Sequence, residues 1–233
     1  MIVREVTTAF SYAFRSLYIA IAEKGNPLKY SKQWGIAFGI VVLLGAGFLG
    51  YRWYDVSKQQ DAHKQFADSI REYDLAMQKG KDWNSIEVLF KSGAQQQKNT
   101  TFGPFFLAFQ AQALLRQGKK DEALQVMDSI IQTLPSQNPL LPLFKTKRAL
   151  IRIDMADEQI KNAGIQELTE LAHDTKNEQK DMALFYLGFY YWVTDNLSEA
   201  KKVWQELVEQ YRDVVAPSPW AQRAQSKLDQ IVA

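Results

Sequence analysis

The chain has 233 residues, no cysteine and a formal net charge of +2; 46% of its residues are hydrophobic and 23% are charged. These proportions are typical of one or two folded units with a substantial core, and they exclude a chain that is disordered by composition. The absence of cysteine excludes disulfides, thiolate catalysis, cysteine-based zinc fingers and thioester lipid anchors. The small net charge argues against a nucleic-acid partner.

Residues 1–33 precede a long apolar run and carry five basic and two acidic residues. Apolar residues recur there at helical spacing from Val6 to Ile21, and Arg15 interrupts them. A helix over residues 6–22 is too short to cross a bilayer. We expect it to lie on the membrane surface, or to be an ordinary amphipathic helix packed on a partner.

The segment from 34 to 51 contains 18 residues without a charge. As a helix it would extend about 27 Å, close to the ~30 Å thickness of a hydrocarbon core. Aromatic residues mark both edges of the segment, as in the aromatic belts of membrane proteins: Trp34, Tyr51, Trp53 and Tyr54. These features predict a transmembrane helix over residues 34–54 that contacts membrane lipid.

The charges beside this segment predict its orientation. Lys24, Lys29 and Lys32 crowd its N-terminal side, whereas bases and acids alternate after it. The positive-inside rule then places residues 1–33 in the cytoplasm and residues 55–233 in the periplasm of a Gram-negative bacterium.

The glycines of the apolar run allow two interpretations. Residues 45–50 fit G-x-G-x-x-G, but a dinucleotide site requires a βαβ unit, and nothing downstream alternates strand with helix. A membrane span is the better interpretation. Small residues would then share one face on which helices could pack closely, unless glycine is simply common in such helices: Gly35, Gly39, Ala46 and Gly50.

Residues 55–233 are predicted to form helical pairs. In residues 181–214, Leu187, Gly188 and Tyr191 are followed by Ala200 at a spacing that resembles a tetratricopeptide repeat. Gly188 and Ala200 are small enough to let two antiparallel helices approach, and Asp195 with Asn196 supplies the turn and a cap.

Weaker signals extend the pattern in both directions. Gly118 and Ala123 mark the turn of a second pair, Gly164 is expected at a close helix contact, and Ser218 with Pro219 begins a last apolar-striped helix. The first predicted pair is 57–79 with 83–93, and the second lies within 104–137. A further pair joins 142–155 to 163–173 through a long turn at 156–162, and a capping helix is predicted at 218–231. The predicted fold class is all-α: one transmembrane helix, then a tetratricopeptide-like solenoid of helical hairpins with a C-terminal capping helix.

Three stretches resemble the bacterial ancillary SecYEG translocon subunit family: GYRWY at 50–54, NTTFG at 99–103 and AKKVW at 200–204. The resemblance covers roughly residues 30–233. It implies a single-pass inner-membrane protein that associates with the Sec translocon and with periplasmic chaperones acting on exported polypeptides. It implies no catalytic residue.

The residues themselves predict a protein-binding scaffold rather than an enzyme. His63 and His173 are the two histidines, no metalloprotease, P-loop or nucleophile-elbow motif occurs, and no cofactor or metal is expected. In tetratricopeptide pairs the first helix of each repeat lines a groove. The candidate groove residues are Phe105, Ala108, Gln112, Leu115, Arg116, Met182, Phe185, Phe189 and Trp192.

The sequence allows two alternatives for the role of its apolar and small-residue faces. Phe185, Phe189 and Trp192 form one stripe that either binds an apolar peptide segment or lies in the core beneath the capping helix or an earlier repeat. The small-residue face of residues 34–54 could instead drive self-association, which would make the protein a homo-oligomeric, membrane-tethered assembly module.

Overall fold

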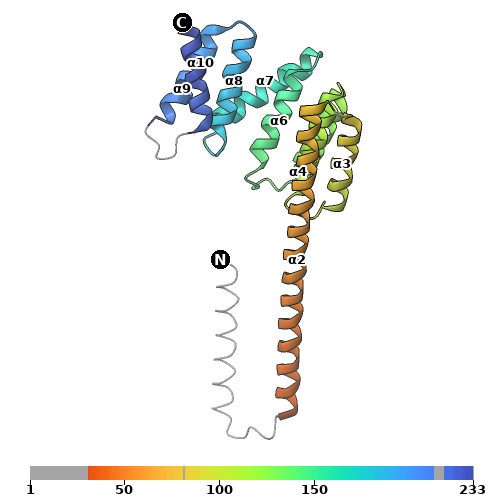
Figure 1. Ribbon diagram of the computed structural model, residues 1–233. Helices are drawn as coiled ribbons and strands as arrows, with labels where there is room; N and C mark the ends of the chain where they lie inside the picture. Colours follow the sequence, from red (N-terminus) through yellow and green to blue (C-terminus); the bar gives the residue numbers. More distant parts are fainter. Residues whose placement is uncertain (1–30, 81, 213–217, 233) are drawn as a thin grey trace. The chain divides into compact units, whose positions relative to one another are not determined.

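The computed structural model describes residues 31–80, 82–212 and 218–232, with side chains described at residue 45 and from residue 47 to residue 231 (Figure 1). All regular elements in these ranges are helices, as predicted, and no strand occurs in them. They are α2 (Ser31–Lys79), α3 (Trp83–Gln96), α4 (Gly103–Arg116), α5 (Lys120–Thr133), α6 (Leu141–Ile153), α7 (Glu158–His173), α8 (Lys180–Val193), α9 (Leu197–Gln210) and α10 (Pro219–Val232). The helix predicted at residues 6–22 lies outside the described residues.

Helix α2 is 49 residues long, and it includes both the segment predicted to be transmembrane and the first helix of the first predicted pair. The chain divides into two compact units, residues 1–58 and 59–233, and α2 contributes to both. No proline interrupts it, which agrees with an unbroken backbone hydrogen-bond ladder.

The described residues contain no helix that is both long enough and apolar enough to cross a membrane. For most of the predicted transmembrane segment 34–54 no side chains are described, because the structure describes none for residues 31–44 and for Ala46.

The second unit is a series of helical hairpins, and each helix from α3 onward packs against its neighbours in the sequence. The C-terminal part of α2 pairs with α3 through a cluster that includes Tyr73, Ala76 and Phe90. The later pairs are α4 with α5, α6 with α7, and α8 with α9, and α10 packs against both α8 and α9. This is the tetratricopeptide-like solenoid with a capping helix that the repeats predict.

The predicted turn at 156–162 is wrong. Helix α7 begins at Glu158, five residues before the predicted start at residue 163. Asp157 is the reason: its carboxylate accepts hydrogen bonds from the backbone N–H groups of Gln159 at 2.8 Å and Ile160 at 3.1 Å. An N-cap of this kind satisfies backbone donors that have no partner within the helix, and so stabilises the first turn.

Two glycines have the close-contact roles that their spacing predicts. A Cβ atom at Gly164 would lie 2.7 Å from the Cβ of Arg152 and 2.8 Å from the carbonyl oxygen of Ala149, so α6 and α7 touch there. At Gly188 a Cβ would lie 2.6 Å from Cδ1 of Trp204. The indole of α9 therefore occupies the space that the missing side chain leaves on α8.

Helix α10 begins as predicted. Ser218 Oγ accepts hydrogen bonds from the backbone N–H groups of Trp220 at 3.1 Å and Ala221 at 3.3 Å. The same hydroxyl donates to Asp181 Oδ2 at 2.5 Å, which ties the start of α10 to the first turn of α8. The predicted apolar stripe of α10 joins the core cluster of α8 and α9: Trp220, Ala224, Leu228 and Ile231.

Candidate functional site: a groove lined by the first helices of the repeats

A cavity of about 370 Å³ lies among α4, α6, α8 and the start of α10. Three of these helices are the first helices of consecutive pairs. Residues at helical spacing on one side of each supply the walls, because side chains three or four positions apart share a helix face. Its apolar wall includes Ala108 and Leu115 of α4, Leu143 and Leu150 of α6, Met182 of α8 and Trp220 of α10.

Two polar groups on the wall already have partners. Gln112 Oε1 accepts a hydrogen bond from the hydroxyl of Tyr73 at 3.0 Å. Asp154 Oδ2 forms an ion pair with the ammonium of Lys120 at 2.7 Å, and that ammonium also donates to the Asp154 carbonyl oxygen. These contacts hold the two ends of the cavity wall in place.

Two neighbouring residues of α6 on the same wall have no such partners among the described residues. Thr146 is 1% exposed, and its hydroxyl oxygen makes no hydrogen bond. Lys147 is half-buried, and no described carboxylate forms an ion pair with its ammonium. Burial lowers the pKa of the Lys147 ammonium, because removal from water disfavours its charged form.

The structure brings four of the predicted groove residues to this cavity: Ala108, Gln112, Leu115 and Met182. Two others lie elsewhere. The ring of Phe105 packs against the ring of Phe144, with centroids 5.9 Å apart, and the guanidinium of Arg116 is 5.8 Å from the ring centroid of Trp83.

The aromatic stripe of α8 is covered in part by α10. Phe185 is 8% exposed, and its ring lies 5.3 Å from that of Trp220. The ammonium of Lys227, also on α10, is 4.1 Å from the ring centroid of Trp192. Phe189 packs against Trp192 at 5.6 Å and is half-buried. The stripe is thus largely occupied by contacts within the chain.

The repeat pattern in the sequence did not predict that α6 contributes residues to the wall of this cavity. Residues 143, 147, 150 and 154 recur at intervals of three or four, which would have placed them on one face. They were missed because the third pair departs from the repeat spacing, so its first helix could not be aligned with α4 and α8.

Of the small residues predicted to share one face of the segment 34–54, Gly50 is the one whose surroundings are described. Gly50 has nothing within 4 Å of an added Cβ, and the same holds for Gly45 and Gly47. The surroundings of Gly35, Gly39 and Ala46 lie outside the description.

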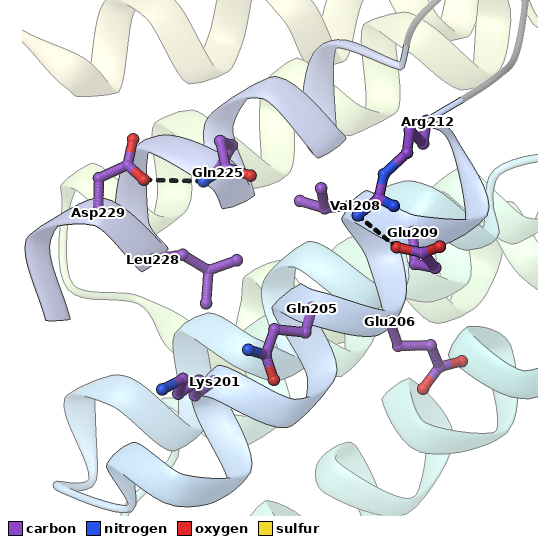
Figure 2. A pocket seen from close by; sticks show the side chains of 9 residues that line it. All are labelled: Lys201, Gln205, Glu206, Val208, Glu209, Arg212, Gln225, Leu228 and Asp229. Carbon is purple, nitrogen blue, oxygen red and sulfur yellow. Dashed lines mark hydrogen bonds and ion pairs between the residues drawn. The ribbon is translucent and has the colours of Figure 1, made fainter. Parts of the chain in front are cut away.

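A larger hollow of about 870 Å³ lies between α9 and α10 (Figure 2). Most of its wall is exposed and polar, and several of its polar side chains bond to one another. Arg212 and Glu209 form an ion pair at 2.6 Å, and Gln225 donates to Asp229 at 2.7 Å. Such a surface is typical of a solvated helix face rather than of a binding site.

In the described ranges, no group of three or more His, Asp or Glu residues could hold a metal. The ring of His63 lies 5.4 Å from that of Phe102, and His173 Nδ1 lies 2.8 Å from the carbonyl oxygen of Thr169. His63 thus contacts the residue that precedes α4, and His173 contacts the preceding turn of its own helix.

The hairpin of α8 and α9 has the geometry of one repeat, with Gly188 against Trp204 at its centre. Residues 182–213 match the tetratricopeptide repeat family model. No curated protein matches the sequence.

Solved structures share the fold of these tetratricopeptide-like repeats. A candidate kinesin light chain from Podosopora anserina with nearly identical TPR-like repeats is similar at a TM-score of 0.50, 15% identity and coverage of 74% of this chain and 85% of that chain. A variant of the same protein gives a TM-score of 0.51 at 14% identity over the same shares. A tetratricopeptide repeat protein from Parabacteroides merdae is 18% identical at a TM-score of 0.46, over 72% of this chain and 60% of that one.

Proposed function

We propose that this protein is a membrane-anchored scaffold whose groove among α4, α6 and α8 binds a segment of another protein. Tetratricopeptide-like repeats are a type of fold that mediates protein–protein interaction. The observation that carries the proposal is the cavity of about 370 Å³, because it is mainly apolar and lies between consecutive repeats. The role is one of binding, without catalysis.

Exposed apolar side chains on α2 support the anchor. Six large hydrophobic residues between positions 48 and 56 are at least 46% exposed: Phe48, Leu49, Tyr51, Trp53, Tyr54 and Val56. At about 100° per residue they are distributed around the whole helix rather than along one stripe. Large apolar side chains exposed on every side of a helix favour apolar surroundings, and a bilayer edge with its aromatic belt would supply them.

The partners follow from the resemblance at residues 50–54, 99–103 and 200–204. We propose translocon subunits, chaperones or exported polypeptides as partners, and a bacterial inner-membrane location with residues 59–233 in the periplasm. The lysines that precede residue 34 support this orientation.

Single cysteines test the groove, since the chain has none of its own. Leu143→Cys places a thiol on the cavity wall, and Val88→Cys places one on α3 at a position that is 59% exposed. With a benzophenone maleimide on each, we expect illumination in cells to crosslink exported polypeptides through position 143 and not through position 88. Equal adducts at both positions would contradict a groove.

A cysteine at the exposed Ser226 tests the location of the second unit. A membrane-impermeant maleimide should label Ser226→Cys in intact spheroplasts. Labelling only after lysis would place the unit in the cytoplasm, and the translocon proposal would be discarded in favour of a cytoplasmic adaptor.

The second candidate function is a homo-oligomeric assembly module. It is favoured by the bare helix surface at Gly45, Gly47 and Gly50, where an added Cβ would meet nothing within 4 Å. Disulfide crosslinking of Gly39→Cys and Gly50→Cys variants distinguishes the two. Self-crosslinked dimers would support assembly, and their absence would leave the scaffold alone.

A further inference from the structure

We infer that the groove selects a segment carrying an acidic side chain, which Lys147 binds while the apolar wall receives the neighbouring residues. This inference rests on the proposed function of the groove and specifies the chemistry of its occupant. The peptides that test it can therefore reveal a groove without an acidic preference as well as the absence of any binding groove.

The cavity wall carries a charge without an ion-pair partner among the described residues. Lys147 lines the cavity, is half-buried, and has no ion-pair partner among the described residues. The acid on the same wall, Asp154, is engaged by Lys120 at 2.7 Å. A half-buried charge without a partner destabilises the fold. A carboxylate from a bound segment would supply the missing partner.

A buried hydroxyl group lies next to this charge in the sequence. Thr146 precedes Lys147, lies on the same cavity wall and is 1% exposed, and its hydroxyl makes no hydrogen bond among the described residues. Nearly all buried polar groups in proteins have a partner. The Thr146 hydroxyl can donate, and a carboxylate oxygen accepts, so the same ligand group satisfies both neighbours.

The apolar wall makes this pairing selective. Leu115, Leu143 and Met182 surround the polar pair from three helices. Side chains of a bound segment that pack on them would exclude water, and a charged hydrogen bond is stronger where water is excluded. A segment with only apolar residues would bury Lys147 without a partner, and a basic segment would add repulsion.

Three synthetic peptides provide the probe. They share one Leu- and Ala-rich sequence with a central Glu, Gln or Lys, and both ends are blocked so that the Glu side chain is the only carboxylate. Binding to the full-length protein in detergent is measured by fluorescence anisotropy. We expect the Glu peptide to bind about tenfold more tightly than the Gln peptide, as for one charge-assisted hydrogen bond.

Variants assign the preference to Lys147. In Lys147→Gln the Glu and Gln peptides should bind alike, and in Lys147→Glu the Lys peptide should bind best. Lys145→Gln is the matched control, since Lys145 is on the same helix but not on the cavity wall. It should keep the wild-type order, and Thr146→Val should lower the affinity for the Glu peptide and leave that for the Lys peptide unchanged.

The outcomes separate the two claims. Equal binding of all three peptides, abolished by Leu115→Glu, would overturn the acidic preference and leave the groove as a binding site. No binding of any peptide would overturn both. A preference for Glu that survives in Lys147→Gln would assign it to another residue and overturn the inference.

Discussion

The indole N–H of Trp204 in α9 donates a hydrogen bond to the carbonyl oxygen of Phe185 in α8 over 3.0 Å. Trp204 is fully buried, and the missing side chain of Gly188 provides the room for its ring. One residue thus combines a large apolar surface with a buried polar contact across the hairpin. Because a buried indole N–H needs an acceptor, this bond also fixes how α9 lies on α8.

Replacing Trp204 with Phe should destabilise the second unit. The change leaves a cavity beside Gly188 and removes the donor to the Phe185 carbonyl, so we expect a loss of about 2–4 kcal/mol in the free energy of unfolding. Urea denaturation followed by circular dichroism measures it. Trp53→Phe is the control, since Trp53 is 75% exposed and its variant should unfold like the wild type. An unchanged midpoint for Trp204→Phe would contradict the packing described.

Ser218→Ala should loosen the capping helix. The Ser218 hydroxyl caps α10 and bonds Asp181 of α8, so its removal leaves backbone N–H groups without an acceptor. We expect a loss of about 1–2 kcal/mol, the usual value for an N-cap. Hydrogen exchange of the α10 amides measures it. Ser226→Ala lies on the exposed side of the same helix and should leave exchange of the first turn unchanged.

A network of four charges joins the second and third pairs. Arg148 of α6 donates to Asp128 of α5 at 2.7 Å and also pairs with Glu167 of α7, and Arg152 reaches Glu167 at 3.1 Å. Burial lowers the pKa of Arg148, but the hydrogen bonds that it donates to Glu167 and Asp128, and the negative charges of these carboxylates, outweigh burial, so the pKa is raised overall. Glu167 accepts hydrogen bonds from both guanidinium groups, and Arg152 also lies 3.7 Å from Asp128.

Glu167→Gln should destabilise the junction between these pairs. The Glu167 side chain is only 12% exposed, so both guanidinium groups lose a poorly solvated partner, and we expect a loss of about 2 kcal/mol. Thermal unfolding at fixed salt measures it. Glu158→Gln breaks the exposed pair with Lys161 and should have no measurable effect. Equal effects of the two substitutions would show that the network contributes no more than a surface pair.

Lys147→Met should stabilise the free protein. The pKa of Lys147 is lowered by burial in the folded state, so the unfolded state binds more protons between that pKa and the ordinary value of 10.5. The free energy of unfolding of the wild type therefore rises with pH across this range, and below it the cost of the buried charge is present in full. Lys147→Met removes the cost at neutral pH.

The pH dependence provides the check. Urea denaturation at neutral pH should show a higher midpoint for Lys147→Met than for the wild type, and the difference should shrink at about pH 10. Lys145→Met, on the same helix, should show neither effect. A lower midpoint for Lys147→Met at neutral pH would mean that Lys147 has a stabilising partner.

Local signals predicted the last repeat and the capping helix closely. The small residues Gly188 and Ala200 and the capping pair Asp195 and Asn196 determine a hairpin within a short stretch. Asn196 indeed caps α9 through the Glu199 N–H at 3.4 Å, and Asp195 adopts φ of 61° in the turn. Such features act between residues that are near in sequence, so a single chain reveals them.

The third pair was predicted less well, because its spacing departs from the repeat and its cap was overlooked. Asp157 begins α7 through its side chain, and this signal was available in the sequence. The α6 wall of the groove was missed for a different reason. Whether Leu143 and Lys147 face a cavity depends on α4 and α8, which are distant in sequence.

Patterns among neighbouring residues were enough to predict that this chain is built of helices, where most of them begin and end, and that a close-packed hairpin forms around Gly188. Apolar periodicity and caps are properties of neighbouring residues, which explains why they were sufficient. The packing of helices distant in sequence shows in addition that α10 partly covers Phe185 and Trp192, and that Lys147 and Thr146 line the cavity without a partner among the described residues. Burial and pairing are set by helices that approach from distant parts of the chain, and no local pattern encodes them.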